Sequence, residues 1–271
     1  GQDDPKAPGK IRSTADPDAR RGKHGDYYDG YVVDVLVDAD SELFTAVNVY
    51  PAGGSESASA LELLEEEQSA HGNPIEQLSI DGAGYDGPVL RELESEQGPN
   101  VEVFVPPKSQ SNGGKFTTEA FRLSEDGSHM TCPAGERSQY KQRDNKRRST
   151  AYRFPAATCQ SCPLRKRCID ENQKHGRTVH RSDYEPEYER VRQRAQTEEY
   201  AAVKREHPKV ERRLGVLMNR YGGRRARYRG LPRVFVQEIL CALTANLKRM
   251  IRLLDAAAMN LGAKGVVFAG V

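Results

Sequence analysis

Asp81 lies where the sequence predicts that a short strand runs into a tight turn. Alternating apolar residues before Asp81 indicate the strand, and a helix is expected to begin after Asp86 as its N-cap. Gly82 and Gly84 permit a turn that other residues would resist. A carboxylate at the carboxyl end of a buried strand can hold a divalent cation while the sheet fixes its position. The alternative is that Asp81 only caps its own turn.

Glu211 lies beside the predicted inward face of a highly charged helix. Apolar residues at helical spacing from Val210 to Tyr221 define that face. Arg212 and Arg213 follow Glu211 directly in the chain. Spacing alone therefore favours ordinary salt bridges between this acid and its basic neighbours.

Four cysteines are grouped in the middle of the chain, and a fifth lies near its end. Cys159 and Cys162 form a Cys-x-x-Cys pair, with Cys132 before it and Cys168 after it. In a chain of intracellular type this pattern favours one tetrahedral Zn²⁺ site over disulfide bonds. The spacing between Cys132 and Cys159 is looser than in common zinc ribbons, so reduced cysteines without a metal are the alternative. Cys241 lies on the apolar face of the last predicted helix and is expected in the core.

The first part of the chain alternates strand and helix patterns. Residues 1–30 are polar and aperiodic and are expected to form a loop. A β-hairpin is predicted from strands at 31–37 and 43–50, followed by a helix at 55–69. The Asp81 strand, its helix and a last strand at 101–105 complete an α/β layer pattern.

The second part is basic and then helical. Residues 108–153 are polar, with few apolar anchors, and lead into the cysteines. A charged helix is expected at 183–199. A closing amphipathic helix is expected at 231–257, and it carries Val236, Leu240, Leu243, Leu247, Ile251 and Leu254. We therefore divide the chain into an α/β part at 1–107, a basic cysteine-rich insertion at 108–181 and a helical part at 182–271.

Charge is segregated along the sequence although its net value is only +2. Residues 31–130 hold nineteen acidic side chains against four Lys or Arg, whereas residues 201–230 hold ten basic against two acidic. Such blocks indicate a surface for a polyanion, with solvated helix faces as the alternative. No signal peptide and no apolar run of membrane-spanning length is visible, so we expect a soluble, cytoplasmic, nucleoid-associated chain without a membrane partner.

Several motifs resemble those of a known enzyme family. The run Ser-Ile-Asp81-Gly-Ala-Gly-Tyr resembles the second-aspartate motif of the DDE transposases of bacterial and archaeal insertion sequences. Val-Glu211-Arg, followed by Tyr-Gly-Gly-Arg-Arg-Ala-Arg-Tyr-Arg-Gly at 221–230, resembles their glutamate motif. The sequence at 246–249 is similar to the end of their final helix. The stretch at 14–20, the hairpin and the Cys-x-x-Cys-Pro segment resemble one subgroup that carries a cysteine-rich insertion before the glutamate.

This resemblance implies a ribonuclease-H-like mixed sheet with flanking helices, interrupted by a zinc-ribbon-like insertion. It implies that Asp81, Glu211 and a first aspartate bind two Mg²⁺ or Mn²⁺ ions for DNA strand cleavage and transfer. The expected partner is double-stranded DNA, at insertion-sequence ends and target, and a homodimer is an option. The basic residues expected to hold DNA phosphates are Arg212, Arg213, Arg220, Arg224, Arg225, Arg227 and Arg229.

Two departures from the family pattern limit the expectation of activity. No strand before Tyr31 carries the first aspartate, so we expect it upstream of Gly1, and Asp16, Asp34 and Asp38 are the remaining candidates. Second, the family has a basic residue about two turns beyond the glutamate. This chain has Met218 and Asn219 at that place, and Arg220 is the nearest basic residue. The rival hypothesis is a non-catalytic zinc-ribbon DNA-binding protein derived from a transposase.

Overall fold

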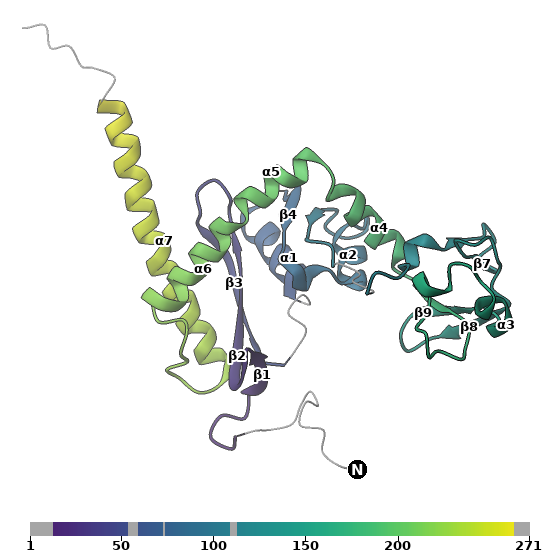
Figure 1. Cartoon of the computed structure of the whole chain (residues 1–271). Helices are drawn as coiled ribbons and strands as arrows, with labels where there is room; N and C mark the ends of the chain where they lie inside the picture. The colour runs from purple at the N-terminus through teal and green to yellow at the C-terminus, as the bar shows by residue number, and fades with distance from the viewer. Residues whose placement is uncertain (1–12, 54–58, 73, 109–112, 263–271) are drawn as a thin grey trace, which may run out of the picture. The chain divides into compact units, whose positions relative to one another are not determined.

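The computed structural model describes residues 13–53, 59–72, 74–108 and 113–262 (Figure 1). The chain is a mixed α/β protein that divides into two compact units. The core unit comprises residues 1–106 and 194–271, and the insertion unit comprises residues 107–193. Among the described helices, none combines the length and apolar character needed to cross a membrane.

The core unit begins with a three-stranded antiparallel sheet. Its strands are β1 (Arg20–His24), β2 (Asp26–Val37) and β3 (Phe44–Pro51), with β2 in the centre. The predicted hairpin at 31–37 and 43–50 is confirmed. The predicted loop at 1–30 is wrong in its later part, because β1 pairs with the first half of β2. Residues 1–12 of that loop lie outside the described part of the chain.

A helix–strand–helix–strand segment follows in the core unit. It contains α1 (Ser59–His71), β4 (Gln77–Ser79), α2 (Gly87–Leu93) and β5 (Glu102–Phe104). β4 and β5 pair in parallel, as expected for strands joined by a helical crossover. The helices bury leucines such as Leu64 and Leu90, which are completely inaccessible to solvent. The first residues of the helix predicted at 55–69 lie outside the described residues.

Three helices complete the core unit. They are α5 (Glu198–Glu206), α6 (Pro208–Arg220) and α7 (Leu231–Gly262). Leu217 of α6 and Ala242 and Ala245 of α7 form a core cluster with Phe44 and Val47 of β3. The Asn246 side chain fixes α7 to β3, because it accepts a hydrogen bond from the Phe44 N–H (2.9 Å) and donates one to the Phe44 carbonyl (2.8 Å).

The insertion unit is built around a small antiparallel sheet in which β9 (Ser149–Arg153) lies between β10 (Thr178–Ser182) and β8 (Tyr140–Asp144). It has more apolar anchors than the sequence suggested, because Phe121, Met130, Tyr152, Phe154 and Val179 form one buried cluster. The single helix predicted at 183–199 is divided at Thr197, which caps α5 through a hydrogen bond from the Tyr200 N–H. The elements are β6 (Arg122–Leu123), β7 (Met130–Thr131), β8 (Tyr140–Asp144), β9 (Ser149–Arg153), α3 (Ala156–Gln160), β10 (Thr178–Ser182) and α4 (Glu185–Arg194), whose last residue already belongs to the core unit.

Candidate functional site

Asp81 is exposed and lies two residues beyond the end of β4, as the sequence predicts, but β4 is only partly buried and is not the buried strand that was expected. The Ile80 N–H donates to the Phe104 carbonyl (3.0 Å), so the parallel pairing with β5 continues up to Asp81. Asp81 Oδ1 accepts a hydrogen bond from the Ala83 N–H (2.9 Å). Asp81 therefore caps its own turn with one of its two carboxylate oxygens. Gly84 is required in this turn, since a Cβ there would lie 2.6 Å from Ile80 Cγ2.

Glu211 is exposed in the first turn of α6. Within the described residues its carboxylate has no hydrogen bond or ion pair, so the predicted salt bridges with its two neighbours are not formed. Arg212 instead pairs with Glu42 at 2.7 Å. Arg213 is buried over the Phe44 ring and donates to the Ala245 carbonyl.

Lys204 and His207 connect the surroundings of Asp81 and Glu211. Lys204 Nζ donates to the Ile80 carbonyl (3.1 Å) and to Ser79 Oγ (3.3 Å). His207 Nδ1 lies 3.0 Å from the same Ser79 hydroxyl, and His207 precedes Glu211 by one helical turn. The end of α5 and the start of α6 are thereby attached to the carboxyl end of β4.

The electrostatics of these two cations involve both acids. Burial lowers the pKa of Lys204, while the carboxylates of Asp81 and Glu211 act in the opposite direction. Burial and the Lys204 charge lower the pKa of His207, and the same two carboxylates again oppose the shift. Asp81 and Glu211 therefore both lie within electrostatic reach of one Lys–His pair. Lys204 and His207 were not singled out from the sequence. Their spacing of seven and four residues before Glu211, on the same side of a helix, could have indicated that they lie near its carboxylate.

An open cleft of about 1330 Å³ runs from Glu211 along α6 to the loop at 222–230, and we call it the arginine cleft. Arg224, Arg225, Arg227 and Arg229 line it and are exposed. The cleft is also lined by the first part of β2, including exposed Tyr27, and by residues that precede β1, such as Asp16. Acidic residues also line the cleft, so its charge is mixed; they are Asp16, Asp26, Asp29, Glu211 and Glu238.

Gln237 of α7 holds the arginine loop in place. Its Nε2 donates to the carbonyls of Gly222 (3.3 Å) and Arg225 (3.0 Å), and its Oε1 accepts from the Arg227 N–H (2.8 Å). Gly222 has a φ of 88°, a conformation that favours glycine. The loop therefore has a defined backbone that presents its arginine side chains to solvent.

The other basic candidates differ in accessibility. Arg220 is exposed at the end of α6. Arg212 is exposed but engaged with Glu42. Burial of Arg213 argues against the predicted phosphate contact for that residue, and its guanidinium instead supports the packing of α6 on β3.

The three candidates for a first aspartate all have local structural contacts. Asp16 Oδ1 accepts from the Tyr31 hydroxyl (2.6 Å) and the Gly230 N–H (3.2 Å). Asp34 accepts a hydrogen bond from the Ser59 hydroxyl. Asp38 accepts from Ser41, whose hydroxyl and N–H lower the pKa of this aspartate. Of the three, only Asp16 shares the arginine cleft with Glu211.

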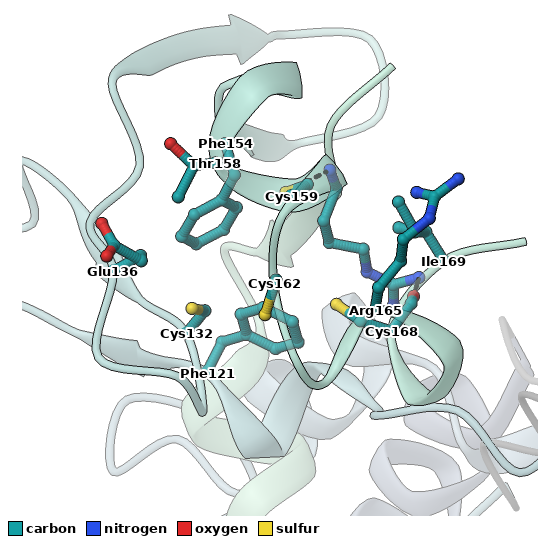
Figure 2. Close-up of a pocket in the computed structure, with 11 residues that line it drawn as sticks. Phe121, Cys132, Glu136, Phe154, Thr158, Cys159, Cys162, Arg165, Cys168 and Ile169 are labelled. Atoms are coloured by element: carbon teal, nitrogen blue, oxygen red, sulfur yellow. Dashed lines mark hydrogen bonds between the residues drawn. The ribbon is translucent and has the colours of Figure 1, made fainter. Parts of the chain in front are cut away.

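Cys132, Cys159, Cys162 and Cys168 line one cavity of about 30 Å³ in the insertion unit (Figure 2). Burial raises the pKa of Cys168; the Arg177 charge opposes this shift, and the other three cysteines add to it. The Sγ atom of Cys159 accepts a hydrogen bond from the Arg177 N–H (3.4 Å). Within the described residues, no group of three or more His, Cys, Asp or Glu has the arrangement of a metal site.

Cys241 packs against the core cluster of α6, α7 and β3, as predicted. Its thiol donates to the Tyr221 carbonyl (3.0 Å).

The fold and these sites define a mixed α/β protein with two acids near one Lys–His pair, and with the arginine cleft, whose charge is mixed, beside Glu211. A family model described as the transposase DDE domain matches residues 131–251. This match confirms the resemblance to DDE transposases; it includes the four clustered cysteines and Glu211, and Asp81 lies before it. No match to a curated protein or to a solved structure was found.

Proposed function

We propose that this chain is a DDE-type transposase whose residues Asp81 and Glu211 hold divalent cations for DNA strand cleavage and transfer. The observation that carries the proposal is geometric: hydrogen bonds from Lys204 and His207 to Ser79 and Ile80 hold the start of the Glu211 helix at the carboxyl end of β4, next to Asp81. Both carboxylates also lie within electrostatic reach of Lys204 and His207. Perturbed titratable groups around a shared pair of acids are typical of functional sites.

The donor set fits the metal that this family uses. Mg²⁺ and Mn²⁺ prefer oxygen ligands, and exposed carboxylates supply them. When bound, two such ions activate an attacking hydroxyl and stabilise the departing oxygen. The residues of this chain hold the site together: Lys204 fixes the Ile80 carbonyl next to Asp81, and its charge offsets the repulsion between the two carboxylates.

We propose that β2–β3 and β4–β5 are parts of one ribonuclease-H-like sheet. In the described structure, the edge of β2 opposite β3 has no strand partner along residues 31–37. A further strand between β2 and β4 would complete the sheet and carry the first aspartate. Without that ligand, the chain as given is expected to bind DNA and not to cut it, which is also the behaviour of the rival, a non-catalytic DNA-binding protein.

The arginine cleft is the proposed surface for the DNA backbone. Its four exposed arginines lie on a loop that Gln237 orders, and Glu211 lines the same cleft. Phosphates bound there would pass close to the proposed metal ligand. Such contacts release counterions from DNA, so affinity should decrease steeply with salt.

We also propose one structural Zn²⁺ in the insertion unit, bound by Cys132, Cys159, Cys162 and Cys168. The shared cavity and the mutual effect of the thiols on the pKa of Cys168 support it. Thiolates must approach zinc to about 2.3 Å, so binding would draw the four sulfurs closer together.

The test of the proposed function is a Mg²⁺-dependent assay on double-stranded DNA that carries insertion-sequence ends. We expect salt-sensitive binding without cleavage by this chain, and cleavage once a strand that carries a first aspartate is supplied. In that complemented form, Asp81→Asn should abolish cleavage and leave binding nearly unchanged. Cleavage that survives Asp81→Asn would contradict the assignment of this aspartate.

A further inference from the structure

α7 has a long apolar stripe on the side that does not face its own unit. The stripe is the apolar face that the sequence predicts for the closing helix, yet the structure exposes it. The residues buried against β3 and the arginine loop are others, chiefly Val234, Gln237, Ala242 and Ala245. The exposed members are Val236 (54%), Ile239 (40%), Leu240 (56%), Leu243 (52%), Leu247 (52%), Met250 (46%), Ile251 (57%) and Leu254 (67%).

The spacing of this stripe is that of a coiled-coil seam. Val236, Leu240, Leu243, Leu247, Met250 and Leu254 alternate steps of four and three residues. That alternation is the heptad repeat, in which two positions of every seven form a seam of period 3.5. A helix that met only solvent on this side would carry polar residues there.

We propose that α7 pairs through this seam with α7 of a second copy of the chain. A helix face that pairs with its own copy must not place like charges opposite each other. The α7 seam meets this condition. The positions flanking the seam are uncharged and include Gln237, Ile239, Thr244, Asn246 and Ile251. The charged residues in this stretch of the helix, Glu238, Lys248, Arg249 and Arg252, lie off the seam.

The dimensions of the seam match those of a stable dimer. From Val236 to Leu254 the helix rises about 27 Å at about 1.5 Å per residue. Each of the eight apolar side chains exposes between 40% and 67% of its surface. Covering them would bury several hundred Å² on each copy, close to the scale of about 800 Å² per partner in a standard interface. Monomers rarely leave a contiguous apolar patch of this kind in water.

The test is the molar mass of the whole chain in solution by light scattering and sedimentation. The native chain should behave as a dimer, with twice the 30.2 kDa of one copy. The double substitution Leu243→Lys and Leu247→Lys should yield a monomer, because four lysines would meet across the seam. Ala256→Lys adds one lysine at an exposed, off-seam position of α7 and should leave the dimer intact.

Circular dichroism must show that the double variant keeps its helix content, since both leucines are exposed and contribute little to the core of one copy. A native chain that remains monomeric at high micromolar concentration would overturn the proposal. A double variant that remains dimeric would overturn it as well. Neither outcome depends on metal binding or DNA cleavage, so the proposal stands apart from the proposed function.

Discussion

Glu238 provides a stability prediction that depends on one buried carboxyl group. Its side chain is 1% exposed, and its Oε2 has no hydrogen-bond partner among the described residues. Gln237 Nε2 donates to its Oε1 at 3.1 Å. Burial raises the pKa of Glu238 from 4.5 to about 7, which the hydrogen bond from Gln237 opposes.

The sign of the pH effect follows from that shift. The folded protein binds the Glu238 proton more tightly than the unfolded chain, so the stabilisation is complete below about pH 4.5 and is lost as the pH rises through about 7. A shift of this size corresponds to a destabilisation of about 3 kcal/mol at pH 8, since one pKa unit is worth about 1.4 kcal/mol. Glu238→Gln removes the charge while keeping the shape of the side chain.

We therefore expect Glu238→Gln to stabilise the protein by about 1–3 kcal/mol at pH 8, and to have little effect near pH 4. The assay is urea unfolding followed by circular dichroism at several pH values between about 4 and 8. Asp255→Asn, an exposed carboxylate on the same helix, serves as the control and should change nothing. Equal pH dependence of the native protein and Glu238→Gln would refute the reasoning.

Three further predictions concern other parts of the chain. Metal analysis should find about one Zn per chain, and Cys162→Ser should lose it while Cys241→Ser retains it; equal zinc in both variants would argue against the site. Arg227→Gln should weaken DNA binding and reduce the slope of log affinity against log salt by about 0.9, and an unchanged slope would show that this arginine contacts no phosphate. Leu217→Ala should destabilise the core unit by about 2–5 kcal/mol in urea unfolding, and a loss below about 1 kcal/mol would show that the α6–α7–β3 core is loosely packed.

The sequence was sufficient for the elements whose periodicity is strong. Alternating valines predicted the β2–β3 hairpin, and the glycine turn located Asp81 at the end of β4. β1 was missed because Arg20–His24 has no apolar alternation, and its strand conformation depends on pairing with β2. Such pairing is a tertiary effect that local propensity does not report.

The environment of the candidate site was less accessible from the sequence. The positions of Asp81 and Glu211 were recognised from motifs, yet the Lys204–His207 pair depends on how α5 and α6 meet β4. The stripe on α7 shows a second limit, because amphipathic periodicity identifies an apolar face without telling which partner covers it. Arg213 illustrates the same point, since a basic residue in a basic run is buried against Phe44.

The central claim is that Asp81 and Glu211 share a divalent cation, and calorimetric titration of Mn²⁺ into four forms of the chain tests it most directly. The forms are the native chain, Asp81→Asn, Glu211→Gln and the double variant, with Glu65→Gln as a control for an exposed acid elsewhere. Each single substitution should weaken binding at least about tenfold, the scale known for groups that merely support metal ligands. The double variant should be scarcely weaker than the worse single variant, because the two ligands act on one ion. Native affinity in either single variant, or fully additive losses, would contradict a shared site.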